Sequence, residues 1–410
     1  MRNITIICVL IALVLYSAYV TGQHRCLSQK ELYERAKRYT PDLDRKIALQ
    51  KAREREAELD GQSQRTTTTK KVNVVVHVIY KTAAENISLA QIESQITALN
   101  KDFSATNADI SNVPSAFSGL IGNPNFVFEL KGVTRKSTTK SSFTISDDDE
   151  KALKLSMFGG TDAWPPDRYL NIWVCNISGP TLGYAYGSAA AGEWYDGVVI
   201  SYKAFGTMGT VTSPNHLGRT ATHEIGHYFD LNHIWGDDED ETNKCSRSDG
   251  ISDTPNQSVA TYGCPSFPLY DACTPSGNGV MFMNYMDYVD DNCMHMFTAG
   301  QVTVMRNTYN NHRPNLGANV TSLVSSTSQD HLFVYPNPFN EQIIIEGNWT
   351  TVEPYTFKLV NQLGVVVYSS TENMSEYLNK TINLSHLQSG IYYLIIENSI
   401  ETYTKKLVKK

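Results

Sequence analysis

Three apolar runs in the first half of the chain have the pattern of buried strands. They are residues 72–80 (VNVVVHVIY), 126–130 (FVFEL) and 169–177 (YLNIWVCNI). β-Branched residues without polar alternation are typical of strands covered on both faces. His77 and Cys175 lie inside these runs, and we interpret both as core residues rather than as ligands.

Helical spacing follows the first of these runs. In residues 87–103 (ISLAQIESQITALNKDF), Ile92, Ile96 and Leu99 share one side, and Ser88 is the expected N-cap. Residues 181–188 (TLGYAYGS) are predicted to form an edge strand. This alternation of strands and helices predicts an α+β domain, with an α/β upper subdomain over an irregular lower one.

The N-terminal 71 residues have a different pattern. Arg2 precedes an apolar run that ends near Val20, with small residues at about Gly22, which predicts a secretory signal peptide over residues 1–22. A membrane anchor is the alternative, but the run is short. Residues 23–71 are rich in charged helix formers and end in the polar run GQSQRTTTTKK. We interpret this segment as a propeptide with an exposed, cleavable linker.

The C-terminal pattern changes again after a polar linker at residues 317–330 (GANVTSLVSSTSQD). Residues 331–410 contain short alternating runs separated by turn residues. They predict a small all-β sandwich.

Composition narrows the classes of partner. The 410 residues carry a net charge of −7, and no basic patch favours nucleic acid, so protein or peptide is the expected partner. Export implies an oxidising compartment, where Cys245, Cys264, Cys273 and Cys293 can pair in three ways. Zinc binding by these four is disfavoured because they form no CxxC pair.

The strongest chemical signal is HEIGHYFDLNH, at residues 223–233. On a helix, His223 and His227 leave the same face and can ligate one metal ion, while Glu224 is placed to deprotonate a metal-bound water. His233 completes three neutral nitrogen ligands after a sharp turn, which leaves a fourth position open, as in catalytic zinc sites. A bare HExxH also occurs by chance on amphipathic helices; the third histidine favours the metal.

This stretch resembles the metzincin signature HExxHxxGxxH, and HEIGHYFDLNHIWGD resembles the pappalysin (ulilysin-like) metalloproteases. The resemblance covers about residues 72–316. One position departs, because Asp230 stands where the signature has glycine. Asp tolerates the left-handed conformation that the turn requires, so we expect zinc binding to persist with some local strain. In metzincins the edge strand pairs with extended substrate.

The resemblance also assigns residues downstream. NYMDYVDDNCMHMFT resembles the Met-turn, with Met286 as an apolar floor beneath the histidines and Tyr288 as the hydroxyl that stabilises the oxyanion. Asp290 and Asp291, with Asn292, are expected to line an acidic pocket that favours Arg or Lys after the scissile bond. Simple surface charge is the alternative for these acids.

A calcium site and two disulfides follow from the same resemblance. Asp249, Asp253 and the Thr254 carbonyl match a calcium-holding loop, and hard oxygen ligands suit Ca²⁺. A solvated acidic loop is the alternative. The resemblance implies two disulfides, one between Cys245 and Cys273 and the other between Cys264 and Cys293.

Cys26 lies near the start of the propeptide, in HRC. Related precursors carry an Arg-Cys element here, so a thiolate is expected to occupy the open zinc position and keep the enzyme latent. An incidental cysteine is the alternative.

YPNP, SGIYYL and the terminal KKLVKK resemble the C-terminal sorting domain of the type IX secretion system. The type IX machinery is therefore an expected partner, and an accessory binding module of the same fold is the alternative.

These observations predict a secreted or cell-surface zinc metalloendopeptidase, monomeric, made as a latent preproenzyme. It would hold one catalytic Zn²⁺ and Ca²⁺. A non-catalytic, surface-delivered binding protein with a degenerate zinc site is the alternative. A zinc amidase acting on non-peptide bonds is a more distant one.

Overall fold

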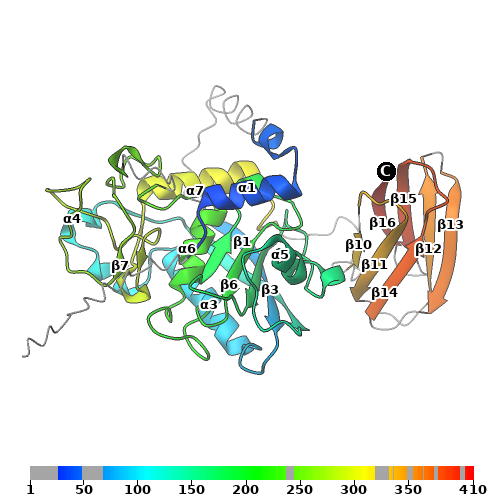
Figure 1. Cartoon of the computed structure of the whole chain (residues 1–410), viewed down its shortest axis with the longest axis horizontal. Helices are drawn as coiled ribbons and strands as arrows, with labels where there is room; N and C mark the ends of the chain where they lie inside the picture. The colour runs from blue at the N-terminus through cyan, green and yellow to red at the C-terminus, as the bar shows by residue number, and fades with distance from the viewer. Residues whose placement is uncertain are drawn as a thin grey trace, which may run out of the picture. The chain divides into compact units, whose positions relative to one another are not determined.

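The computed structural model describes residues 26–48, 68–236, 244–318, 332–335, 337–348, 354–362, 364–373, 377–397 and 402–410. The chain divides into two compact units, Met1–Ala318 and Asn319–Lys410 (Figure 1). The expected signal peptide, most of the run GQSQRTTTTKK and most of the linker at 317–330 lie outside the described residues. Within the described ranges, no helix is long and apolar enough to cross a membrane.

A five-stranded sheet in the order β3-β1-β4-β6-β5 forms the centre of the first unit. Its strands are β1 (Lys70–Tyr80), β3 (Phe126–Ser137), β4 (Leu170–Cys175), β5 (Gly183–Ala185) and β6 (Val198–Ser201). All neighbours pair in parallel except β5, which pairs antiparallel with β6 at the edge. Residues 72–79 are all buried, as the continuous apolar run predicts.

His77 in β1 and Cys175 in β4 are core residues, as predicted. His77 is fully buried between Thr134 and Asn171, at 2.8 and 2.9 Å from its two ring nitrogens, and burial lowers its pKa to about 4. Cys175 is fully buried as well, and desolvation raises the pKa of its thiol.

The helices cover this sheet and approach its edge strand. They are α1 (Gln29–Tyr39), α3 (Leu89–Asp102), α5 (Asp147–Lys154), α6 (Arg219–Tyr228) and α7 (Ala299–His312), with a single turn at α4 (Ser115–Ser118). Ser88 caps α3 by accepting a hydrogen bond from Gln91 N, as predicted. Helix α6 packs against β5, β6 and α3, so the edge strand lies beside the histidine helix.

The edge strand is shorter than the sequence pattern predicts. Of residues 181–188 only Gly183–Ala185 form β5, and a 3₁₀ turn, η3 (Ser188–Ala190), follows. The backbone N–H of Ser188 donates to Asp230 Oδ1 at 2.7 Å, so that donor is used by a side chain instead of a strand. In the opposite direction, the predicted strand at 126–130 continues to Ser137.

The chain after α6 is irregular, as expected for the lower subdomain. Its described residues, 229–236 and 244–298, contain only short strands and 3₁₀ turns before α7, namely η4 (Lys244–Ser246), β7 (Tyr262–Gly263), β8 (Tyr288–Val289), η5 (Asp291–Cys293) and β9 (Phe297–Thr298). Further pieces of this kind occur earlier, at η1 (Ala108–Asn112), β2 (Ile121–Gly122) and η2 (Ser156–Phe158). Disulfides join Cys245 to Cys273 and Cys264 to Cys293, which confirms the predicted pairing.

The second unit consists of two antiparallel sheets. One has the order β10-β11-β14 and the other β13-β12-β15-β16. Their bounds are β10 (Leu332–Tyr335), β11 (Gln342–Asn348), β12 (Pro354–Asn361), β13 (Val366–Asn373), β14 (Tyr377–Asn383), β15 (Gly390–Glu397) and β16 (Thr402–Lys409). Alternate residues, such as Tyr355, Phe357 and Leu359, form its own apolar core. The predicted all-β sandwich is confirmed.

Candidate active site

Helix α6 carries the first half of the histidine motif. His223, Glu224 and His227 all lie within it, and each is at most 4% exposed. Because residues four apart share a helix face, the two imidazoles leave α6 together, with their Nε2 atoms 3.1 Å apart.

A tight turn after α6 returns the chain to the same point. Asp230 has a φ of 66°, the left-handed conformation predicted at this position. Leu231 N donates to Gly226 O at 3.0 Å, which ends the helix, and His233 then reaches back so that its Nε2 lies 3.1 Å from that of His227.

The Asp230 side chain does something a glycine cannot. Its Oδ1 accepts the hydrogen bond from Ser188 N, just after β5, and its Oδ2 accepts one from Thr308 Oγ1 of α7 at 3.0 Å. The carboxylate therefore ties the turn to the edge strand and to the last helix. These two bonds offset the cost of a non-glycine residue in this conformation.

Backbone carbonyls fix the orientation of two imidazoles. The Nδ1 atoms of His223 and His227 lie 2.7 and 2.6 Å from the carbonyl oxygens of Tyr285 and Leu231. A carbonyl only accepts, so each Nδ1 carries the proton and each Nε2 presents its lone pair to the common centre.

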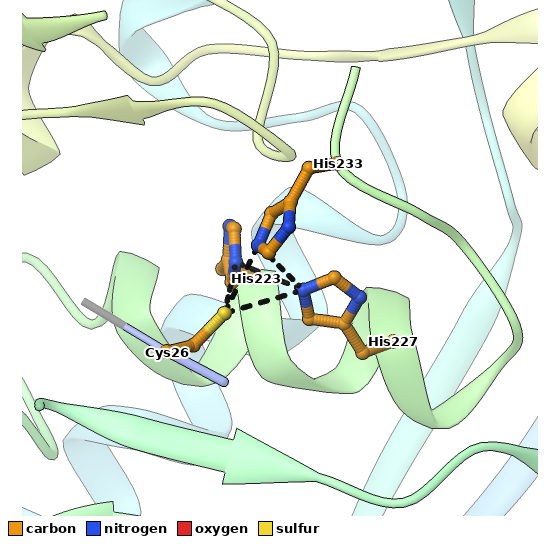
Figure 2. A group of neighbouring side chains, drawn as sticks. All are labelled: Cys26, His223, His227 and His233. Carbon is orange, nitrogen blue, oxygen red and sulfur yellow. Dashed lines mark hydrogen bonds between the residues drawn. The ribbon is translucent and has the colours of Figure 1, made fainter. Parts of the chain in front are cut away.

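Cys26 lies at this centre (Figure 2). Its Sγ is 3.3, 3.5 and 3.0 Å from the Nε2 atoms of His223, His227 and His233. The four ligand atoms all lie within 4.8 Å of one another, and the four residues are buried. Among the described residues, this is the only group of three or more His, Cys, Asp or Glu side chains so arranged.

The donor set fits zinc. A tetrahedral zinc with bonds of about 2 Å to nitrogen and about 2.3 Å to sulfur separates its ligand atoms by roughly 3.4 Å. The nitrogen–nitrogen distances of 3.1 Å and the sulfur–nitrogen distances of 3.0–3.5 Å agree with that figure. Imidazole nitrogens with one thiolate are ligands that zinc prefers.

Glu224 faces a small cavity of about 10 Å³, room for about one water molecule. Its Oε2 is buried and has no hydrogen-bond partner among the described residues. Burial raises the pKa of this carboxyl well above its usual range. Gly183 of β5 allows the close approach of the helix, because a Cβ there would lie 2.9 Å from Glu224 Cγ.

Met286 and Tyr288 close the site from the lower subdomain. Met286 is fully buried, and a Cβ on Gly226 of α6 would lie only 2.5 Å from its sulfur, so this helix glycine admits the methionine beneath the histidines. Tyr288 places its hydroxyl 3.2 Å from Cys26 Sγ and donates to Cys26 O at 3.2 Å.

The two acidic residues after Tyr288 have different positions. Asp291 is 1% exposed, lines the cavity next to Glu224, and accepts hydrogen bonds from Leu217 N at 2.7 Å and Arg219 N at 3.4 Å at the start of α6. Asp290 is only half-buried and, in the described part of the chain, does not line that cavity.

The residues expected to hold calcium lie close together. Thr254 Oγ1 donates to both Asp249 oxygens, at 2.8 and 2.9 Å, and Asp253 accepts from Thr298 Oγ1 and Gly300 N at 2.6 and 2.7 Å. Burial, followed by the charge of Asp253, raises the pKa of Asp249 to about 6. The contacts of the Asp carboxylates are thus with protein donors.

Sequence reasoning missed the residues that hold α6 in place. Arg219 Nη1 donates to Asp102 Oδ1 at 2.6 Å, and Thr222 Oγ1 donates to Asp102 Oδ2 at 2.6 Å, all three residues being buried. It also missed Trp235, whose ring stacks on His233 at 4.3 Å. A tryptophan two residues after a metal ligand was a usable signal. The contact of Arg219 with Asp102 had no such signal, because the two residues are 117 positions apart in the sequence.

Comparisons with known proteins agree with this geometry. Residues 156–310 match the family described as pregnancy-associated plasma protein-A, and residues 333–410 match the secretion system C-terminal sorting domain. An extracellular metalloprotease of Neurospora crassa is 34% identical over 254 residues, which cover 60% of this chain and 76% of that protein.

Two solved structures from Tannerella forsythia are also similar. Mature mirolysin in complex with a cleaved peptide is 47% identical, with a TM-score of 0.59, covering 64% of this chain and all of that one. A promirolysin mutant is 43% identical, with a TM-score of 0.62, covering 73% of this chain and 99% of that one. The chain therefore belongs to the pappalysin family, as a secreted or cell-surface zinc metalloendopeptidase with a type IX sorting domain.

Proposed function

We propose that the chain is a latent precursor in which His223, His227 and His233 hold the catalytic zinc and Cys26 closes the fourth position. The observation that carries this proposal is the approach of Cys26 Sγ to within 3.0–3.5 Å of all three Nε2 atoms. A zinc ion held there supplies Lewis acidity for peptide hydrolysis. Removal of the prosegment would take away the sulfur and open the position.

Glu224 is the general base and acid of this proposal. It takes a proton from the attacking water and later gives it to the leaving nitrogen. The buried Oε2 and the adjoining cavity of about 10 Å³ support this role, because they leave one carboxylate oxygen facing room for one water.

Tyr288 stabilises the oxyanion, and Met286 supports the histidines from below. In the precursor the Tyr288 hydroxyl is engaged by Cys26, through both Sγ and the backbone carbonyl. Departure of Cys26 therefore frees two groups together, namely the fourth metal position and the hydroxyl that donates to the developing charge.

The test of latency uses the full precursor with Cys26→Ala. We expect this variant to cleave a peptide library before any processing, whereas the unaltered precursor cleaves only after the prosegment has been removed. Adding a chelator should abolish both activities. Equal inactivity of both unprocessed precursors, together with full activity after processing, would overturn the role of the thiol.

We further propose a preference for Arg or Lys after the scissile bond. Asp291 supports it, because this acidic residue lines the cavity beside Glu224 and His223. In the described part of the chain, Asp290 and Asn292 do not line that cavity, so they support this preference less than the sequence predicted. Cleavage profiling of the processed enzyme should show basic residues at that position, and a profile without them would contradict the proposal.

Calcium is proposed at Asp249, Asp253 and Thr254, in the lower subdomain. Asp253 lies close enough to Asp249 for its charge to contribute to the raised pKa of that carboxyl, and two hard oxygen groups in one loop support a cation there. A monomeric enzyme that acts on protein or peptide substrates and is exported by the type IX machinery completes the proposal. A non-catalytic binding protein would instead show bound zinc and no chelator-sensitive cleavage.

A further inference from the structure

The prosegment makes a second set of contacts, on a surface distinct from the histidine site. Leu32, Ala36 and Leu43 are each at most 2% exposed. They belong to an apolar cluster with catalytic-domain residues, which are Tyr184, Tyr186, Ala190, Tyr195 and Trp173. At its start, Gln29 Nε2 donates to Ala185 O of the edge strand at 3.2 Å. Helix α1 is thus an amphipathic helix seated on an apolar surface.

Charge is matched across the same contact. The Arg35 Nη2 atom lies 3.2 Å from Glu150 Oε2, and its Nε lies 3.5 Å from Asp147 Oδ1. Arg38, one turn later, donates to both oxygens of Asp147, at 2.7 and 2.8 Å. Both acceptors stand in the first turn of α5, within its acidic run DDDE.

The Glu150 contact is buried on both sides. The side chain of Glu150 is 0% exposed and that of Arg35 is 7% exposed. Glu150 also pairs with fully buried Lys154 at 2.7 Å and accepts a hydrogen bond from Tyr184 OH at 2.8 Å. Without the prosegment, the group of Asp147, Glu150 and Lys154 carries a net charge of −1, and Arg35 and Arg38 bring positive charge to it. Removing one partner of a buried pair leaves an uncompensated charge, which is costly.

We propose that this surface is a ligand site of the processed enzyme in its own right, and that its ligand is the severed prosegment. It recognises an amphipathic helix with two arginines one turn apart, and it holds that helix without any contribution from the Cys26 sulfur. This proposal rests on the assignment of residues 23–71 as a prosegment. Cutting the chain between residues 48 and 68 would then not by itself release the inhibitor.

The test uses the full chain with a specific protease site inserted between residues 48 and 68, in the Glu224→Gln background to prevent self-digestion. After cutting, gel filtration and a dissociation time course measure how long the prosegment fragment stays bound. With Cys26→Ala we expect the fragment to remain bound, also in the presence of a chelator. Adding Arg35→Met should speed its release at least about tenfold.

Lys37→Met is the matched control. It also removes one positive charge from α1, but Lys37 pairs with Asp44 inside the prosegment and is 38% exposed. The prosegment fragment that carries Lys37→Met should be released at the same rate as the fragment without this substitution. A second measurement avoids any effect of the substitutions on folding of the precursor. In it, free peptides of residues 23–48 carrying Cys26→Ala, with and without Arg35→Met, are added to the processed chain, and their competition for binding to it is measured.

The outcomes separate this proposal from latency by the thiol. Retention of the Cys26→Ala fragment and its loss with Arg35→Met support the site, whatever Cys26 does to activity. Release of the Cys26→Ala fragment on cutting, while the Cys26 fragment is retained only without chelator, would overturn the site and leave thiol latency standing. Equal release of the Arg35→Met and Lys37→Met fragments would also overturn it.

Discussion

The two halves of the catalytic unit differ in what holds them together. The upper half, from β1 to α6, is built on a central sheet whose first strand is buried at every residue of 72–79, with apolar residues of that strand packed into clusters on both faces. The lower half, after His233, shares one of these apolar clusters, through residues such as Met283, Met286 and Phe297, and adds two disulfides, short strands and buried carboxylates with backbone donors. The active site lies between them, with the histidines and Glu224 from above and Met286 and Tyr288 from below.

This difference teaches where each half is vulnerable. An apolar core responds to changes in side-chain volume and hardly to redox state or pH. Crosslinks and buried carboxylates respond to reductants, protons and cations. Under reductants, protons or loss of cations the enzyme should therefore lose its shape first in the lower half, whereas its chemistry should depend most on the histidines and Glu224 of the upper half.

The largest effect is expected from Glu224→Gln, in the upper half. The substitution keeps the shape of the side chain but removes the group that accepts the proton, so turnover of the processed enzyme should fall by about 10³-fold or more. Zinc content, measured by metal analysis, should stay at one per chain. Loss of zinc together with activity would show that Glu224 supports the metal site rather than the proton transfer.

Reduction of the two disulfides should affect the lower half alone. Opening loops of 28 and 29 residues is expected to cost about 3 kcal/mol of local stability for each bond. Hydrogen exchange should then rise in residues 244–298, while the amides of β1 stay protected. Equal loss of protection in both halves would break the comparison, because it would mean that the two halves unfold as one unit.

Tyr288→Phe tests the contribution of the lower half to the chemistry. Loss of one donor to the oxyanion should lower kcat about 10²-fold and leave KM nearly unchanged. Tyr262→Phe is the control, since that ring lies 5.9 Å from Tyr288 but its side chain is exposed. A large rise in KM with kcat retained would assign Tyr288 to substrate binding instead.

The smallest expected effect is a pH-dependent response to calcium. The pKa of Asp249 is raised from 3.8 to about 6, so the folded chain keeps a proton there that the unfolded chain loses across this window. Without calcium, this group therefore makes stability fall as pH rises from about 4 to about 6.

Calcium binds the deprotonated carboxylate, so its stabilising effect should appear above about pH 6 and vanish below that pH. Melting temperatures with and without calcium at pH 5 and pH 8 measure this. Asp249→Asn should remove the response at pH 8. The same calcium shift at both values of pH would contradict a site at Asp249.

Local patterns predicted much of the fold. The β1 strand, the Ser88 cap, the sandwich and the left-handed Asp230 were all visible, because each depends on neighbouring residues or on a period of two or 3.6. The predicted edge strand was too long, because the backbone N–H of Ser188 bonds to the side chain of Asp230, 42 residues away, instead of to a strand. The sequence also predicted that two neighbouring acidic residues would line one pocket. Asp291 lies at the cavity, whereas Asp290 is half-buried and does not line it in the described part of the chain.

By itself the sequence predicted the metal-binding motif, because it sits within 11 consecutive residues whose helix and turn dictate its geometry. Tertiary structure alone decided what surrounds that motif. The contacts of Cys26 with His223, of Arg219 with Asp102 and of Arg35 with Glu150 join residues separated by 197, 117 and 115 positions. No local periodicity encodes such pairs, since they form only when the packed sheet and helices bring distant segments together.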